Sequence, residues 1–151
     1  MTSEHNDVVV YLGVELGRQL DRREYRLRIN SGHIQRSEKS YFIPEIYVFP
    51  TSAFRQRLGH PERLEMYHES LFLVAEFWSR STGNYDIDTK IPEYQARGDL
   101  EIWRVHPYQR TVIMWRRQPN GQYDETVETG GTVQLHALPH VAVDLDALFE
   151  L

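Results

Sequence analysis

The sequence predicts a single α/β domain: one mixed β-sheet flanked by helices. Segments with helical hydrophobic spacing occur near both ends and in the middle of the chain, and strand-like segments run between them. The chain has 151 residues, which suits one ordinary domain that encloses a real core. It has no internal repeat and no stretch rich enough in Gly, Pro or Ser to divide it. We therefore expect one domain over residues 1–151.

The first expected element is an amphipathic helix over residues 6–20, with Ser3 or Asn6 as its N-cap. Its apolar residues recur at steps of four: Val8, Leu12, Leu16 and Leu20. Gly13 and Gly17 lie one turn apart on this helix, and each costs it about 1 kcal/mol relative to alanine. We expect close packing against another element to compensate for that cost.

Three strands are expected next. Residues 25–30 alternate between apolar and polar side chains, which predicts a half-buried strand with a basic outer face. Residues 41–50 predict a second strand, interrupted at Pro44 because proline donates no ladder hydrogen bond. Residues 71–78 are apolar on both faces, which is typical of a central strand covered on both sides.

The chain after the second strand is expected to be mostly loop over residues 51–70, with one helical turn around residues 61–64. After the third strand, residues 85–99 predict a short helix that Asp86 or Asp88 would cap and Gly98 would end. The remaining expected elements are a hairpin, two weaker strands and a final helix capped by Asp144, in the ranges 100–105, 110–117, 123–129, 132–135 and 141–151.

Composition excludes several kinds of protein. The chain has no cysteine, so it has no disulfide, thiolate zinc site or cysteine nucleophile. Its start, MTSEHND, is unlike a signal peptide, and no apolar run approaches the ~20 residues of a membrane span. A soluble, cytoplasmic protein is expected. The net charge of −5 argues against a general nucleic-acid coat, whose affinity comes from many phosphate contacts, but not against an enzyme with local basic residues.

Two carboxylates stand where predicted strands meet loops. Glu45 follows Pro44, and Glu76 ends the apolar run of the third strand. A carboxylate in a low-dielectric place must be paired, protonated or bound to a cation. Two of them on neighbouring strands would suit a hard cation such as Mg²⁺, and Lys90 would supply positive charge nearby. A simple arginine partner for each glutamate stays open as the alternative.

The order of motifs is more specific than this spacing. Residues 73–82 read LVAEFWSRST, and Tyr85-Asp86, Lys90 and Tyr94 follow. Further matching positions are His5, Pro44-Glu45 before an apolar strand, Gly98, Trp103, Pro107 and the acidic-apolar tail at 143–149. From about residue 5 to its end, the chain resembles the Uma-two family, a large bacterial family of small restriction endonuclease-like proteins in the PD-(D/E)XK nuclease superfamily.

The resemblance implies a restriction endonuclease-like fold and Mg²⁺- or Mn²⁺-dependent hydrolysis of DNA. It implies that Glu45 and Glu76 hold the metal, with the Phe77 main-chain carbonyl as a further ligand. Lys90 would orient the attacking water or stabilise the transition state, because Trp78 occupies the position where the wider superfamily has its lysine.

Other residues are candidates for supporting roles, and a homodimer is expected. The accessory candidates are Glu15, Ser79 and Asp86, and those for contact with nucleic acid are Arg80, Arg26 and Arg28. For Glu15, solvation or pairing with an arginine is the alternative.

The sequence also departs from the family pattern. Glu45 replaces an aspartate, Arg80 replaces a proline, and Pro92 lies two residues beyond Lys90. If the helix began near Pro92, Lys90 would lie on the loop before it. The family's N-terminal segment is expected to have no counterpart here. These departures keep a second interpretation open, a catalytically degenerate nuclease fold that acts as a binding or dimerisation module.

Overall fold

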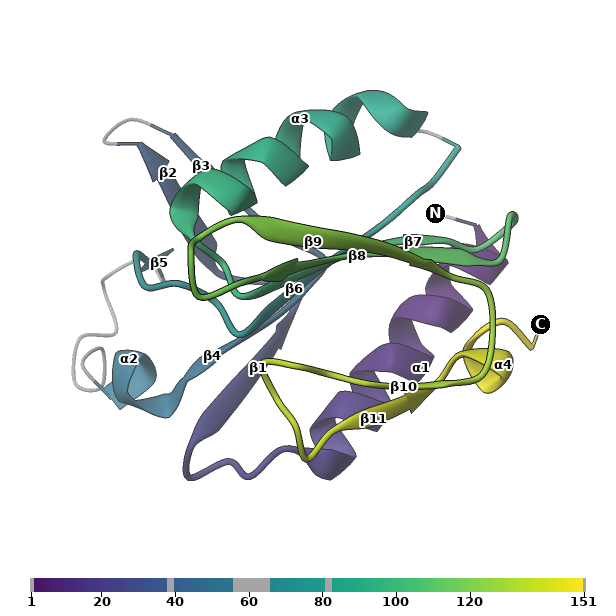
Figure 1. Ribbon diagram of the computed structural model, residues 1–151, viewed down its shortest axis with the longest axis horizontal. Helices are drawn as coiled ribbons and strands as arrows, with labels where there is room; N and C mark the ends of the chain where they lie inside the picture. Colours follow the sequence, from purple (N-terminus) through teal and green to yellow (C-terminus); the bar gives the residue numbers. More distant parts are fainter. Residues whose placement is uncertain (1, 38–39, 56–65, 81–82, 151) are drawn as a thin grey trace.

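A computed structural model describes residues 2–37, 40–55, 66–80 and 83–150, with the side chains of 35–37, 40–41, 66 and 83–87 left out, and confirms a mixed sheet flanked by helices (Figure 1). The elements in chain order are α1 (Ser3–Gln19), β1 (Tyr25–Ile29), β2 (His33–Ser37), β3 (Ser40–Phe42), β4 (Ile46–Pro50), α2 (Thr51–Arg55), β5 (Met66–Tyr67), β6 (Leu73–Phe77), α3 (Gly83–Arg97), β7 (Glu101–His106), β8 (Thr111–Arg117), β9 (Tyr123–Glu128), β10 (Thr132–Gln134), β11 (Ala142–Asp144) and α4 (Leu145–Leu148).

The main sheet has six strands in the order β1-β4-β6-β7-β8-β9. Strands β6 and β7 are parallel and α3 connects them, whereas the other pairs are antiparallel. Every residue of β6 is buried, so the prediction of a central strand covered on both sides is confirmed. Two small sheets, β3-β2-β5 and β10-β11, complete the fold.

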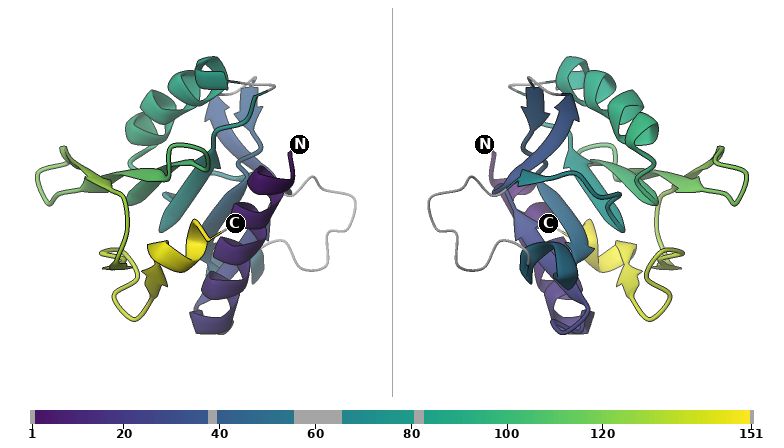
Figure 2. Two further views of the ribbon diagram at one scale, coloured as in Figure 1. Left: turned by 90° about the vertical axis from the view of Figure 1, so that its right-hand side faces the viewer. Right: turned by 90° about the vertical axis from the view of Figure 1, so that its left-hand side faces the viewer.

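Helices cover the two faces of the main sheet, as Figure 2 shows from two sides. On one face α1 and α4 pack in a core, here called the α1 core, that includes Leu12, Ala75 and Phe77. On the other face α3 packs in a second core, the α3 core, that includes Val74 and Tyr94. Side chains along β6 therefore alternate between the two cores, as strand geometry requires.

Helix α1 begins three residues earlier than expected. Thr2 is its N-cap, and its hydroxyl accepts a hydrogen bond of 3.2 Å from the main-chain N–H of His5, so Ser3 and Asn6 were the wrong caps. The expected close packing at the glycines is confirmed. A methyl group on Gly13 would lie 2.6 Å from Cδ1 of Ile29 in β1.

Helix α3 also begins earlier, at Gly83, which places Asp86 and Asp88 inside it rather than at its cap. Gly98 follows its last residue with a φ of +78°, as the predicted helix end requires. Pro92 lies inside the helix, so Lys90 belongs to the helix and not to a leading loop. The carbonyl that loses its hydrogen-bond partner to Pro92 is that of Asp88, which is exposed, so water can replace the bond.

The remaining segments contain short elements, several of which the sequence did not predict. The break at Pro44 is confirmed, since β3 and β4 lie in different sheets. The short α2, β2, β5 and β11 were missed; β2 pairs with β3, which directly follows it, and with β5, which lies far from it along the chain. The helical turn expected at residues 61–64 lies outside the described residues. The hairpin β7-β8, the strands β9 and β10 and the Asp144 cap of α4 are as predicted.

No helix in the described parts of the chain is both long enough and apolar enough to cross a membrane.

Candidate functional site

Glu76 lies near the carboxyl end of β6 and is only 2% exposed. The Tyr94 hydroxyl donates a hydrogen bond of 2.7 Å to its Oε1, and the Lys90 ammonium lies 3.5 Å from the same oxygen. Lys90 and Tyr94 are four residues apart, so both project from the same face of α3. The helix thus brings to Glu76 the lysine that the sequence predicted to supply positive charge near the two carboxylates.

The environment of this pair is largely dry. The Lys90 side chain is 13% exposed and that of Glu76 is 3% exposed. Phe42 of β3 covers both groups on α3, since its ring lies 5.9 Å from the Lys90 ammonium and packs edge-on against Tyr94. Low polarity strengthens the attraction between the two charges and raises the cost of removing either one.

Glu45 lies directly before β4, the strand next to that of Glu76. The ladder between β4 and β6 includes the pair Ile46 and Ala75, and one residue beyond it Glu45 lies opposite Glu76 on the neighbouring strand. Nε2 of His5 lies 3.2 Å from Oε1 of Glu45 and 3.1 Å from Oε2. The two backbones are adjacent, while His5 holds one carboxylate from α1 and residues of α3 hold the other.

His5 is the site residue to which sequence reasoning assigned no role. It comes from the first turn of α1, is 2% exposed, and its ring packs edge-on against Phe77 at 6.1 Å. Burial lowers the pKa of the imidazole, and the Phe77 main-chain carbonyl opposes that shift in part. The signal was present in the sequence, because His5 matched a family position, but only the fold shows what it contacts.

The donor groups at this end of β6 suit a hard divalent cation. Glu45 and Glu76 supply carboxylate oxygens, and the Phe77 carbonyl is a further oxygen donor. Within the described residues, no three His, Asp or Glu side chains gather closely enough to form a metal cluster. Mg²⁺ commonly takes one or two carboxylates and keeps several waters, so the groups present fit it without a third acidic side chain.

Only some of the accessory candidates lie near the end of β6. Ser79 is buried two residues after β6, and Arg80 beside it is exposed. Glu15 pairs with Arg18 on α1 at 2.6 Å. It lies ten residues from His5, or ~15 Å along the helix, so it does not join Glu45. The side chain of Asp86 lies outside the described part of the structure.

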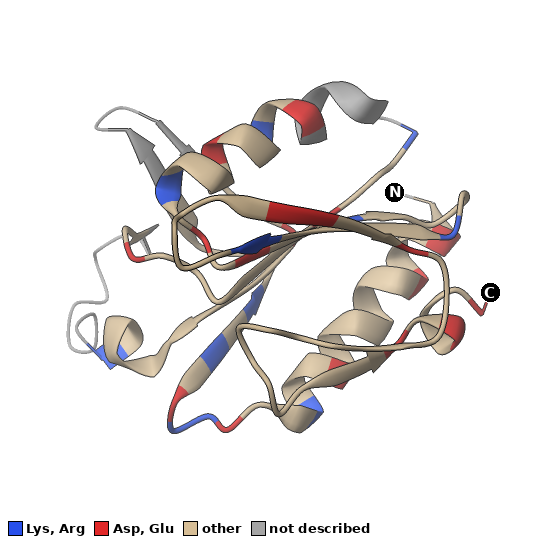
Figure 3. Cartoon of the chain, viewed as in Figure 1, with Lys and Arg blue, Asp and Glu red and all other residues tan. Residues whose placement is uncertain are grey.

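Arg26 and Arg28 project from β1 onto aromatic rings, and Figure 3 shows their positive charge along this strand. The Arg26 guanidinium lies 4.5 Å from the ring centre of Phe54, and that of Arg28 lies 5.1 Å from the ring centre of Phe49. Burial, followed by the charges of neighbouring arginines, lowers the pKa of Arg26. This edge of the sheet therefore concentrates positive charge on a chain that is acidic overall.

Arg104 is a second neighbour of Glu76 that the sequence did not reveal. The two residues are partners in the parallel register of β6 and β7. Nη1 of Arg104 lies 3.6 Å from the carboxylate of Asp88 on α3. Helix α3 is therefore joined to adjacent strands by two ion pairs, Lys90 with Glu76 and Asp88 with Arg104.

Comparison with known proteins places this chain in a family. The chain matches the model of the Uma2 family, described as "Putative restriction endonuclease", over residues 1–146. The chain belongs to this family. The resemblance inferred from the motif order is confirmed.

Among solved structures, the Uma2-family chain is similar to "a putative nuclease belonging to DUF820" from Anabaena variabilis ATCC 29413. The TM-score is 0.76 at 17% sequence identity, and the match covers 99% of this chain and 82% of that one. This likeness shows a shared fold and confirms the predicted architecture. No curated protein matches the chain.

Proposed function

We propose that this Uma2-family protein is a metal-dependent endonuclease that hydrolyses phosphodiester bonds in DNA. The observation that carries the proposal is the contact of Lys90 and Tyr94 with the buried Glu76, at the strand end where Glu45 lies opposite. Membership of a family described as restriction endonucleases supports the reaction class. Glu45, Glu76 and Lys90 form the proposed catalytic set.

Each residue has a distinct role in the proposal. Glu45, Glu76 and the Phe77 carbonyl would hold Mg²⁺ or Mn²⁺, which supplies a Lewis acid for the phosphoryl oxygen and lowers the pKa of a bound water. Lys90 orients the attacking water and stabilises negative charge on the phosphoryl group. Tyr94 and His5 are positioning residues, since each holds one of the two carboxylates.

Positive charge on the surface would bind the DNA backbone. Arg26 and Arg28 on β1, together with the exposed Arg80 near the end of β6, are the proposed phosphate contacts. Phosphate contacts position a nucleic acid without reading its sequence, so these arginines would set affinity and orientation. A homodimer and a cytoplasmic location stay predictions of the sequence, and analytical ultracentrifugation would test the first.

The second candidate function is a degenerate nuclease fold that binds or dimerises without catalysis. One observation favours it: the imidazole of His5 lies within 3.2 Å of both Glu45 oxygens, where it competes with a cation for them. Glu45 also has a longer arm than the aspartate of the family pattern, and a misplacement of ~1 Å can cost ~100-fold in rate.

A plasmid-nicking assay in Mn²⁺ separates the two functions. The wild type should nick supercoiled DNA, and Glu76→Gln and Lys90→Gln should each reduce the rate by about 100-fold or more, as loss of one group that stabilises charge in the transition state does. Glu15→Gln is the matched control, because it makes the same chemical change on α1 away from the site and should retain activity. Equal residual nicking in all four proteins would indicate contamination and would contradict the proposal.

A further inference from the structure

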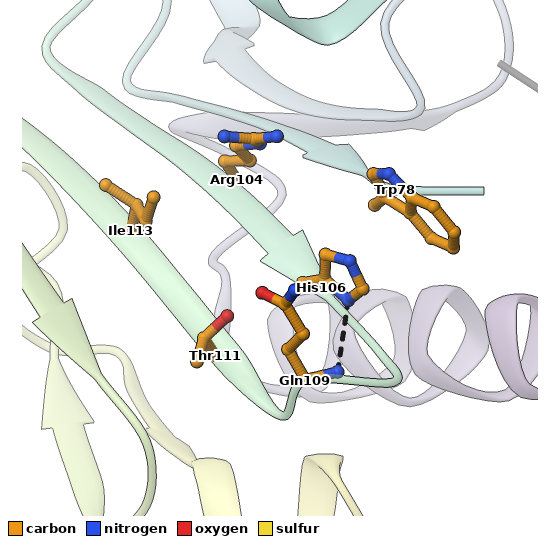
Figure 4. Close-up of a pocket in the computed structure, with 6 residues that line it drawn as sticks. All are labelled: Trp78, Arg104, His106, Gln109, Thr111 and Ile113. Carbon is orange, nitrogen blue, oxygen red and sulfur yellow. Dashed lines mark hydrogen bonds between the residues drawn. The ribbon is translucent and has the colours of Figure 1, made fainter. Parts of the chain in front are cut away.

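A cavity of about 330 Å³ opens beside β7, the strand that pairs with β6 next to Glu76. It is lined by Trp78, Arg104, His106, Gln109, Thr111 and Ile113 (Figure 4). Arg104 is the register partner of Glu76, and neighbouring strands lie ~4.8 Å apart. The cavity therefore begins one strand away from Glu76 on the face that α3 covers.

The polar lining of this cavity favours an anionic ligand. None of its six lining residues is acidic, and Arg104 contributes a guanidinium. Asp88, which pairs with Arg104 at 3.6 Å, has a side chain that is 61% exposed, so solvent weakens that pair and a phosphate can compete for the arginine. Guanidinium binds phosphate with two parallel N–H donors.

The tautomer of His106 adds a further donor. Its Nδ1 accepts a hydrogen bond of 3.1 Å from the main-chain N–H of Gln109, so in the neutral ring the proton lies on Nε2. Burial, followed by the charge of Arg104, lowers the pKa of this imidazole. Burial therefore favours the neutral ring, and Arg104 supplies the guanidinium charge of the cavity lining.

The aromatic wall of the cavity is held in place before any ligand arrives. The Trp78 and His106 rings stack with centres 4.4 Å apart and planes 16° apart, and Tyr108 packs edge-on against both. Ile113 adds an apolar surface on the adjoining strand. Flat apolar surfaces beside a guanidinium match the two parts of a nucleotide, since the base stacks and the phosphate takes the charge.

We infer that this cavity, if the proposed nuclease function holds, receives one unpaired nucleotide adjoining the scissile phosphate. Its base packs against the surface formed by Trp78 and Ile113, and its phosphate binds Arg104. The volume lies near the lower limit of the ~300–1,000 Å³ typical of small-ligand pockets, which suits one nucleotide and not a base pair. The substrate is therefore DNA that is single-stranded, or has a base turned out of the stack, at this position.

Binding measured without metal tests the inference independently of hydrolysis. In EDTA, a ten-nucleotide single strand is titrated into the ¹⁵N-labelled wild type while the three tryptophan indole N–H signals are followed. The Trp78 signal should shift, whereas those of Trp103 and Trp115, which donate to Glu101 and Glu125, should not. A hairpin duplex with the same sequence should bind about tenfold more weakly, since its bases are not free to stack.

Variants then identify the phosphate contact. Arg104→Gln should weaken single-strand binding by about tenfold, as loss of a guanidinium contact to phosphate does. Arg117→Gln, at the far end of β8 from Thr111, is the matched control and should bind as the wild type does. Gln109→Ala, in the exposed turn after β7, provides a second lining variant that leaves the strands intact, and it should also weaken binding because it removes a side chain that lines the cavity.

The outcomes separate this inference from the proposed hydrolysis. A Trp78 response to the single strand with no Mn²⁺-dependent nicking would support the nucleotide pocket and overturn the nuclease. Nicking with no Trp78 response, with equal affinity for single strand and duplex, or with undiminished binding by Arg104→Gln would overturn the pocket.

Discussion

The hydroxyl of Tyr94 donates a 2.7 Å hydrogen bond to the carboxylate of Glu76 within the α3 core. Tyr94 is fully buried, so its ring anchors the helix while its hydroxyl fixes the orientation of the carboxylate. One turn earlier on the same helix, Lys90 contacts the same oxygen. The packing of α3 therefore determines the geometry of the proposed site.

Tyr94→Phe tests whether this hydrogen bond matters for activity. The change removes one oxygen and preserves the packing of the ring, so the fold should persist. We expect Mn²⁺-dependent nicking to fall by about 10–100-fold, as loss of a group that orients a metal ligand typically does. Tyr123→Phe, whose hydroxyl donates to the Asp99 carbonyl away from the site, is the control. Equal activity in both variants would show that the Tyr94 hydroxyl has only a structural role.

His5→Asn tests the role assigned to the imidazole that holds Glu45. The shorter side chain cannot reach both Glu45 oxygens, so we expect nicking to fall by about 10–100-fold with little change in the circular dichroism spectrum. His140→Asn is the control, because His140 is an exposed residue that stacks on Tyr25. A gain in activity by His5→Asn would instead indicate that His5 competes with the metal for Glu45.

The two glycines of α1 allow a test of its packing on β1. Gly17→Ala should stabilise the protein by about 0.5–1 kcal/mol, the usual gain for alanine over glycine in a helix, because a methyl group there meets Leu27 at an ordinary 3.7 Å. Gly13→Ala should gain less, since its methyl group would lie 2.6 Å from Ile29 and Ile29 must move. Urea unfolding measures both, and equal gains would contradict the packing described for Gly13.

The buried Asp99 predicts a pH dependence of stability. Desolvation raises its pKa to about 6 from a reference of 3.8, against the opposing charge of Arg97 and the hydrogen bond from Leu71. Between these pH values the folded state keeps a proton that the unfolded state has released, so the stability contributed by Asp99 falls as pH rises. A shift of this size is equivalent to about 3 kcal/mol.

Asp99→Asn removes this titration. The unfolding free energy of the wild type minus that of Asp99→Asn should therefore decrease as pH rises from about 4 to about 6. Above that range the difference should level off. Urea unfolding at intervals across that range measures the difference. A constant difference, or one that grows with pH, would show that Asp99 does not titrate as its burial implies.

Local patterns predicted the elements whose side chains repeat regularly. The steps of four from Val8 to Leu20 identified α1, and the continuous apolar run at 71–78 identified β6 as the central strand. Short elements such as β2 and β5 escaped, because they pair with each other across a long stretch of chain and carry little periodicity of their own. The starts of α1 and α3 were placed too late, since polar first turns look like loops.

Part of the site could also be predicted from local features of the sequence. Glu45, Glu76 and Lys90 stand out through charge and motif order, and the fold brings Lys90 to Glu76 as the motif suggested. His5 and Arg104 reach the site through the packing of α1 and the register of β7. Neither relationship follows from spacing along the chain, because both depend on contacts between distant segments.

The most direct test of the central claim is calorimetric titration of the wild type, Glu45→Gln and Glu76→Gln with Mn²⁺. The account predicts saturable binding by the wild type, with Glu15→Gln equal to it. It also predicts at least about tenfold weaker binding when either Glu45 or Glu76 loses its charge, since carboxylates are the ligands such cations prefer. No Mn²⁺ binding by the folded wild type, or undiminished binding by both glutamine variants, would contradict a metal site at the end of β6.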